Sequence, residues 1–416
     1  MVKTLRSFRH RNYRILFPAN AVSNTGTWAQ RIAQDWLVLE LTGSSIYLGI
    51  VTGLQFAPAL LFSMQGGKLA DQFNKRILLI YCNFGGFISS LALGLLIVTE
   101  NIQLWHIFLF AFTSGLASAL DAPVRQAFTA EVVGKRDLPN AVSLNSANFN
   151  AARLIGPGIS GLLIAAFGTG PSFLLNALSF LGVIIVLMTI REKELFLEKK
   201  PAMKSKIREA LSYIKRRPDL FGTMTVVFFA TTFGFNFAIY NALMTTKVFD
   251  LGVEVFGALG SILAIGSLTG AIVSAKLEKR RTPKAVMFGV FIFGIFLIFG
   301  SAAPNFMIYA LILPVTGFIA LLTMITANSL VQVRSDPAIR GRVMGVYLTV
   351  FLGGTPIGSP LLGALAAWIG IRWTMFICGT ITATSGVIVY LWLKDRIGNP
   401  ESYAIDDVLD TTYNDK

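Results

Sequence analysis

This chain has few charged residues, few cysteines and few histidines, and each scarcity excludes a class of protein. Only 14% of its 416 residues are charged, whereas a soluble domain carries about 25%. Its two cysteines, Cys82 and Cys378, both fall in apolar segments and predict no disulfide framework. The two histidines, His10 and His106, show no metal-ligand spacing, so we expect no metal and no cofactor.

Long apolar runs take the place of the missing charge. Hydrophobic residues make up 54% of the chain and form repeated runs of about 20, the length of a transmembrane helix. Runs such as ILLIYCNFGGFISSLALGLLIVT are continuous rather than alternating, which predicts helices and not strands. We expect an all-α polytopic membrane protein with twelve spans near 14–40, 45–66, 77–99, 104–124, 139–167, 172–190, 220–246, 254–275, 284–303, 306–330, 341–368 and 371–393.

The positive charge lies in alternate predicted loops. The formal net charge is +14, and of 36 Lys and Arg residues all lie in these loops and the termini except Arg31, Arg153, Lys247 and Arg372. By the positive-inside rule, this places both termini in the cytoplasm of a multi-pass protein of the cell (cytoplasmic or inner) membrane. Because basic loops then face an anionic leaflet, the lipid bilayer is the expected partner and nucleic acid is not.

The chain divides at a polar, basic segment. We expect an N-terminal six-helix bundle over 1–190, a cytoplasmic linker over 191–219, a C-terminal six-helix bundle over 220–395 and a disordered acidic tail over 396–416.

The linker contains a short amphipathic pattern. Ile207, Leu211 and Ile214 recur at helical spacing among Lys and Arg residues. The pattern is typical of a helix lying on the inner membrane surface. An ordinary solvated linker helix explains it equally well.

The two halves resemble each other in sequence. LPNAVSLNSANFNAARLIGPGISGLL in the fifth span is echoed by AIRGRVMGVYLTVFLGGTPIGSPLLG in the eleventh, and Pro157 and Asp137 match Pro356 and Asp336. Two pseudo-symmetric six-helix bundles in parallel repeat are typical of transporters, which bind substrate between the halves near the midplane and rock around it. Glycine pairs that suit close packing at that seam are Gly49/Gly53, Gly266/Gly270 and Gly354/Gly358.

Polar residues form one stripe along the first span. A charge in a bilayer-spanning helix costs at least about 2.5–3.5 kcal/mol, so Arg31 and Asp35, one turn apart, indicate function. We take Asp35 as the candidate proton-carrying carboxylate. Alternatively, the two side chains merely neutralise each other. The predicted substrate and proton pathway in this span comprises Asn24, Thr27, Arg31, Gln34 and Asp35, with Asn20 and Gln30 beside it.

The fifth and seventh spans extend this predicted pathway. Asn150 and Arg153 lie one turn apart in the fifth span, and Asn236 and Tyr240 lie at the same spacing in the seventh. Arg153 is predicted to lie at a depth similar to that of Arg31. Two cations and one carboxylate favour an anionic or zwitterionic substrate.

The segment GGKLADQFNKR resembles the loop signature of the major facilitator superfamily, through Gly67, Asp71, Lys75 and Arg76. The segments TGSSIYLGIVTGLQFAPALL, DAPVRQAFTAEVV and LPNA resemble the drug/proton antiporter-like branch that includes macrolide-efflux proteins and the enterobactin exporter. The resemblance extends over residues 8–393 and implies the major facilitator fold.

The same resemblance implies a gate on the cytoplasmic side. We expect Asp71 to approach the positive N-terminus of the eleventh span, and Arg76 to meet Asp121. Gly67 is expected to allow tight packing. Gln72 stands where the pattern has an arginine, so one arm of the gate is missing. Alternatively, the charges only set topology. The expected gate residues are Gly67, Asp71, Lys75, Arg76, Asp121 and Arg125.

RLIGPGISG in the fifth span resembles the antiporter motif of that helix. Proline removes a helix hydrogen bond and the glycines permit a bend, so we expect a hinge; a plain packing kink is the alternative. The motif residues are Gly156, Pro157, Gly158 and Gly161, with Ser160 in place of a further glycine.

These features predict a transporter. We expect a monomeric secondary exporter of hydrophobic or amphipathic small molecules, such as a drug, macrolide or siderophore, working by proton antiport and alternating access. The alternatives are a facilitator or lipid transporter without proton coupling, or a non-transporting receptor. No convergent nucleophile and base stand out, so an enzyme is not expected.

Overall fold

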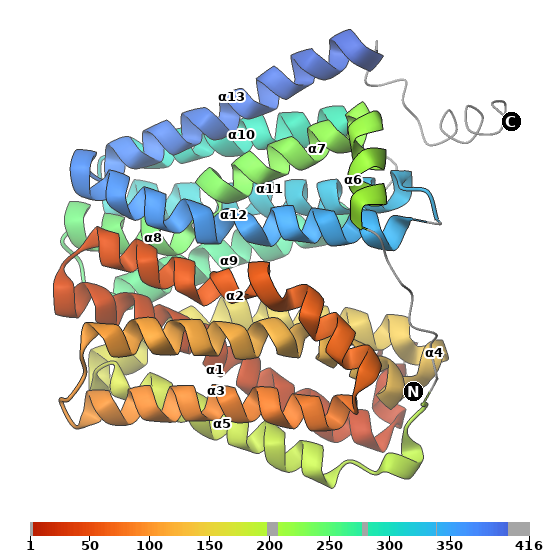
Figure 1. The fold of residues 1–416 in the computed structure, drawn as a ribbon. Coiled ribbons are helices and arrows are strands. Elements are labelled where there is room, and N and C mark those ends of the chain that lie inside the picture. Colours follow the sequence, from red (N-terminus) through yellow and green to blue (C-terminus); the bar gives the residue numbers. More distant parts are fainter. Residues whose placement is uncertain (1–2, 198–206, 277–281, 338, 398–416) are drawn as a thin grey trace, which may run out of the picture. The chain divides into compact units, whose positions relative to one another are not determined.

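The computed structural model describes residues 3–197, 207–276, 282–337 and 339–397, and within these ranges all regular structure is helical (Figure 1). The all-α prediction is confirmed. Most of the predicted acidic tail over 396–416 lies outside the described residues.

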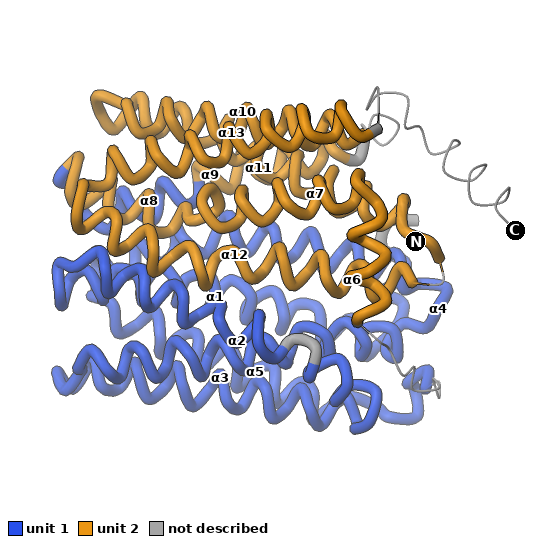
Figure 2. The backbone as a smooth tube through the Cα atoms, turned by 45° about the horizontal axis from the view of Figure 1, so that its top comes forward, with its two compact units in different colours: residues 1–203, 250–261 blue, residues 204–249, 262–416 orange. Residues whose placement is uncertain are grey.

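The chain forms two compact units (Figure 2). Unit 1 comprises residues 1–203 and 250–261, and unit 2 comprises 204–249 and 262–416. Helix α9 (Val253–Lys276) therefore contributes its first turns to unit 1 and its remainder to unit 2.

Unit 1 contains the first six predicted spans, in five long helices. They are α1 (Arg11–Thr42), α2 (Ser45–Gln72), α3 (Lys75–Val98), α4 (Leu104–Phe167) and α5 (Gly170–Thr189). Where α1, α3, α4 and α5 meet near their basic loops, they bury an apolar core that includes Tyr13, Leu79, Phe128 and Val183.

Helix α4 joins two predicted spans without a loop. A straight helix of its 64 residues would be about 96 Å long, three times the thickness of a hydrocarbon core. The chain leaves helical geometry within α4 at Gly134, with φ 69° and ψ 167°, a region that favours glycine. The predicted spans 104–124 and 139–167 leave a loop over 125–138. Residues on both sides of Gly134 are helical, so the structure has a single-residue break there instead of a loop.

Twelve spans are accounted for in this way. Ten helical segments of the described chain are long and apolar enough to cross a membrane, with α4 counted once. Helix α1 is not among them because its polar stripe makes it the least apolar of the long helices. Counting α4 twice and adding α1 restores the predicted number.

Unit 2 contains the later spans, and its seventh span differs from the prediction. Its long helices after α9 are α10 (Pro283–Ser301), α11 (Phe306–Arg334), α12 (Arg340–Ile369) and α13 (Ile371–Ile397). The seventh span, expected as one helix, is broken into α7 (Pro218–Phe229), the π-helical turn η3 (Ala230–Gly234), α8 (Phe237–Leu243) and the π-helical turn η4 (Met244–Val248).

Each unit carries a short lead-in helix before its first span. In unit 1, η1 (Lys3–Arg9) is held by hydrogen bonds from Ser7 to Asn140 and to the carbonyl of Asp137. In unit 2, α6 (Ile207–Arg216) is held because Glu209 pairs with Arg342 and the Tyr213 hydroxyl accepts from the amide of Asp336.

The buried face of α6 explains the amphipathic pattern of the linker. Ile214 is buried against unit 2, and Leu211 is half exposed. The side chain of Ile207 lies outside what the structure describes.

The expectation that the glycine pairs line a seam between the halves is wrong for two of them. A Cβ at Gly266 or Gly270 would collide with backbone atoms of α11, and one at Gly354 or Gly358 would collide with η3. Both pairs serve close packing inside unit 2.

Candidate functional site

Asp35 lies deep inside unit 1 and is held by neutral groups. The carboxylate accepts hydrogen bonds from the Thr52 hydroxyl and the Gln55 amide, each at 3.4 Å, and it is 2% exposed. Gln55 also donates to Gln34, which in turn donates to the carbonyl of Ile107. This chain of amides fixes the carboxylate to α2 and α4.

Arg31 faces aromatic rings instead. Its guanidinium carbon lies 5.1 Å from the ring centre of Trp28 and 4.9 Å from that of Phe56. In the described part of the chain, no ion pair within 4.0 Å joins Arg31 to Asp35. A direct contact between the two side chains is therefore absent, although their opposite charges still interact across one helical turn.

Arg153 converges on the same indole from α4. Its guanidinium carbon lies 5.7 Å from the ring centre of Trp28, and Phe149 meets the indole edge to face, also at 5.7 Å. Since both guanidinium carbons lie within 6 Å of one ring centre, they are no more than about 11 Å apart. The structure brings together two cations predicted on separate spans.

Gly156 allows this approach. A Cβ at that position would lie 2.6 Å from the Cβ of Trp28 and 3.0 Å from the carbonyl oxygen of Thr25. Further along α4, Gly158 lies beside Ser261 of α9, and Gly161 lies against Gly257 of the same helix. The antiporter-like motif thus packs closely on two helices. The helical geometry of α4 is lost at Gly134 and not at Pro157, where the hinge stays a prediction.

The other predicted pathway residues of unit 1 vary in their surroundings. Asn24 and Thr27 are partly buried along the Arg31 stripe of α1. Asn150 donates to the carbonyl of Ser146 in its own helix. Gln30 is buried on another face, where it accepts from Ser90 and Asn176.

The basic residues of the loop signature bind unit 1 itself. Lys75 pairs with Glu131 at 2.7 Å. Arg76 donates to the carbonyls of Leu187 and Met188 at the end of α5 and pairs with Glu192. The predicted contact between Arg76 and Asp121 is therefore wrong: the arginine instead binds carbonyls in the last turn of α5.

Asp121 pairs with Arg125 one turn along α4. Two hydrogen bonds of 2.6 and 2.7 Å join them. Asn83 of α3 donates to Asp121, and Arg125 donates to Asn20 of α1. The four side chains connect α1, α3 and α4 in one polar network.

Gly67 and Asp71 are the residues of the loop signature that lie on α2, and the surroundings of Gly67 differ from the prediction. A Cβ at Gly67 would have no neighbour within 4 Å, so the tight packing predicted there is wrong. It occurs at Gly66, where a Cβ would lie 2.8 Å from Pro123 and 3.2 Å from the backbone of Leu120. Asp71 is exposed in the last turn of α2, and its contact with the eleventh span stays a prediction.

In unit 2, Asn236 and Tyr240 stabilise the break in the seventh span. The Asn236 amide donates to the carbonyl of Thr232 and accepts from Ser359 of α12. The Tyr240 hydroxyl donates to the carbonyl of Phe233. These side chains replace backbone hydrogen bonds that the irregular turn loses. The NH2 group and the side-chain oxygen of Asn236 and the hydroxyl of Tyr240 thus all form hydrogen bonds inside unit 2.

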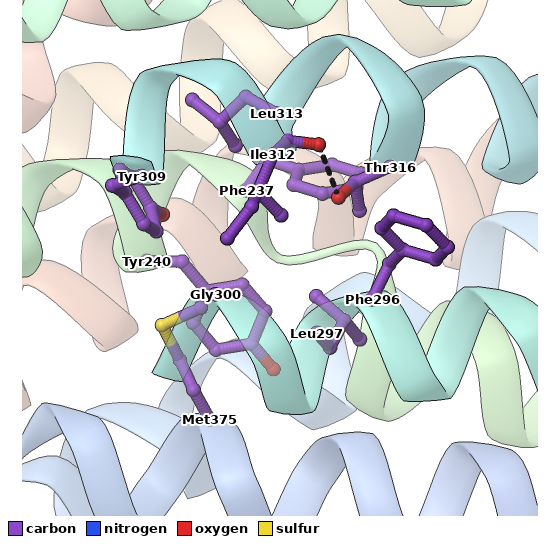
Figure 3. A pocket seen from close by; sticks show the side chains of 10 residues that line it. All are labelled: Phe237, Tyr240, Phe296, Leu297, Gly300, Tyr309, Ile312, Leu313, Thr316 and Met375. Carbon is purple, nitrogen blue, oxygen red and sulfur yellow. Dashed lines mark hydrogen bonds between the residues drawn. The ribbon is translucent and has the colours of Figure 1, made fainter. Parts of the chain in front are cut away.

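Tyr240 also lines a small apolar cavity (Figure 3). The ring of Phe237 from α8, Phe296 from α10 and Met375 from α13 border it, and Thr316 of α11 bonds to its own helix at Ile312. The lining offers no charged group, so the cavity suits apolar contacts alone.

Sequence reasoning missed the aromatic and amide partners of the charged residues. Trp28 lies three positions before Arg31, which places both on one face of a helix. Thr52 and Gln55 show the same spacing on α2. Among the described residues no group of His, Cys, Asp and Glu side chains is arranged to hold a metal ion.

Comparisons with known proteins agree with this architecture. The family model of transmembrane secretion effectors matches residues 2–406. The staphyloferrin A transporter of Staphylococcus aureus is 26% identical over 88% of this chain and 92% of its own length. The multidrug efflux pump Tap of Mycolicibacterium fortuitum is 24% identical over 90% and 93%. The enterobactin exporter EntS of Shigella flexneri is 22% identical over 86% of each chain.

A solved structure shows the same fold. A bacterial homolog of the human lysosomal transporter Spinster superposes with a TM-score of 0.75 over 92% of this chain and 96% of that one, at 14% identity. From the family match, the helices and these relatives, the chain belongs to the transmembrane secretion effectors of the major facilitator superfamily, and it is a multi-pass membrane transporter and not an enzyme.

Proposed function

We propose that this transporter exports an anionic, amphipathic small molecule in exchange for protons, by alternating access. The relatives named as exporters and efflux pumps support the direction and the class of cargo, which includes siderophores and drugs. The charge distribution supports localisation in the cell membrane with both termini in the cytoplasm.

The buried carboxylate of Asp35 carries the proposal. No cation in the described residues pairs with it within 4.0 Å, and its hydrogen bonds come from the neutral groups of Thr52 and Gln55. A carboxylate that no ion pair holds in its charged form can gain and lose a proton as access alternates. Protonation there would change the charge next to Arg31.

The test is flux in proteoliposomes with an imposed pH gradient, using a substrate found by an accumulation screen of siderophores, antibiotics and dyes. We expect the gradient to drive export and Asp35→Asn to abolish that dependence. Glu40→Gln is the matched control, because Glu40 is an exposed acid on the same helix. Gradient-independent flux together with an active Asp35→Asn variant would favour a facilitator and overturn the proposal.

A further inference from the structure

We propose that Arg31 and Arg153 bind two anionic groups of one substrate, so that the cargo is a small molecule with two or more carboxylates or comparable oxyanions. This inference rests on the proposed function for the site and adds the chemistry of the ligand.

Unlike Arg125 and Arg334, neither of these two arginines has a carboxylate within 4.0 Å in the described part of the chain. Arg125 pairs with Asp121, and Arg334 pairs with Asp219 in unit 2. Within the described residues, neither Arg31 nor Arg153 makes an ion pair or a hydrogen bond.

Their nitrogen atoms are not completely enclosed. Both side chains are partly buried, yet none of their nitrogens is among the fully buried polar atoms that lack a partner. Two donor-rich groups therefore remain available to a ligand, and a guanidinium fork binds a carboxylate through two parallel hydrogen bonds.

The surroundings select the class of ligand further. The rings of Trp28 and Phe56 face the guanidinium groups, and an ion pair with a carboxylate is stronger than such a contact. The carboxylate of Asp35 offsets part of the charge of Arg31, so the two guanidinium groups together keep a net positive charge. This charge disfavours an organic cation, and a monoanion can pair with only one of the two groups. A molecule with two oxyanions satisfies both, while the rings cover its apolar part.

Binding of citrate, tricarballylate, acetate and ethidium to the full-length protein, measured by isothermal titration calorimetry, tests the inference. We expect the two polycarboxylates to bind, acetate to bind much more weakly and ethidium not to bind. Arg31→Gln and Arg153→Gln should each weaken citrate binding about 10- to 100-fold, the effect of losing a charged hydrogen-bonding partner. Arg372→Gln is the control, because Arg372 bonds to the carbonyl of Ser301 in unit 2.

Arg31→Lys and Arg153→Lys keep the charge and guard against a folding defect, and they should bind citrate more tightly than the glutamine variants. Citrate affinity that is unchanged in both glutamine variants, acetate binding as tight as citrate binding, or preferential binding of ethidium would each overturn the inference. Asp35→Asn separates the two proposals: it should retain citrate binding even though it loses coupling to the pH gradient.

Discussion

Arg31 and Asp35 lie one helical turn apart on α1 but contact different partners. Asp35 accepts from Thr52 and Gln55 at 3.4 Å, whereas the guanidinium carbon of Arg31 lies 4.9 Å from the ring centre of Phe56. Neither group is therefore held by a direct contact with the other. This separation underlies both proposals above.

The Asp121–Arg125 pair should be a stabilising element of unit 1. Replacing Arg125 with Gln leaves a mostly buried carboxylate without its cation, and we expect the free energy of unfolding to fall by about 1–3 kcal/mol. Thermal unfolding in detergent measures the change. The double variant Asp121→Asn/Arg125→Gln should recover part of the loss.

Glu192→Gln is the control for that experiment. Glu192 is 67% exposed in its pair with Arg76, so its removal should change stability by no more than about 0.5 kcal/mol. Equal stability of the wild type and Arg125→Gln would contradict a structural role for the buried pair.

Gly66 and Gly67 should respond oppositely to substitution by alanine. At Gly66 the new methyl group would press on Pro123 and Leu120, which should cost about 1–3 kcal/mol. At Gly67 it meets open space within a helix, so alanine should be neutral or stabilising by up to about 1 kcal/mol. Thermal unfolding of both variants measures these changes. If Gly67→Ala were less stable than Gly66→Ala, the packing role predicted for Gly67 would be right.

Tyr240→Phe should affect stability and not substrate recognition. The variant removes the hydroxyl that donates to the carbonyl of Phe233, at a cost of about 1 kcal/mol. Asn236→Ala removes two hydrogen bonds and should cost more. If substrate affinity fell tenfold in Tyr240→Phe at unchanged stability, the sequence-based prediction that Tyr240 lines the substrate pathway would be right.

Docking of η1 should depend on pH through Asp137. The hydrogen bond from His10, followed by the charge of Arg9, holds the pKa of Asp137 below its ordinary value. A carboxylate whose pKa is lowered by folding contributes stability above its unfolded pKa and loses it as pH falls through the folded one. The difference in stability between the wild type and Asp137→Asn should therefore be largest above about pH 4 and disappear below it.

Thermal unfolding of both proteins across that range provides the measurement, and Glu192→Gln, whose carboxylate is exposed, provides the comparison. A difference that grew as the solution became more acidic would show that the carboxylate is not stabilised in its charged form.

Much of the fold follows from composition and periodicity alone. Continuous apolar runs predict the spans because their length matches the bilayer, and the sequence echo around Pro157 and Pro356 predicts the repeat. The break at Gly134 and the irregular turns of the seventh span are not predictable in this way, since they depend on which side chains can replace lost backbone hydrogen bonds.

In the candidate site, the sequence identifies the charged residues but not their partners. Charge in an apolar run identifies Arg31, Asp35 and Arg153, because such residues are costly. Their partners depend on the rotation of each helix, which places Gln30 on one face and Arg31 on another, and on the close approach at Gly156. Resemblance to a motif was less informative for Gly67 and Arg76, whose neighbours differ from those it implied.

The lead-in helices define where each structural repeat begins. Both η1 and α6 attach to the connection between the fourth and fifth spans of their own unit, through Asp137 and Asp336 respectively. The part of the joining segment that begins at Ile207 therefore belongs to the second repeat. It corresponds to η1, which precedes the first span of the first repeat. Each repeat unit is therefore six spans together with one short helix that precedes them.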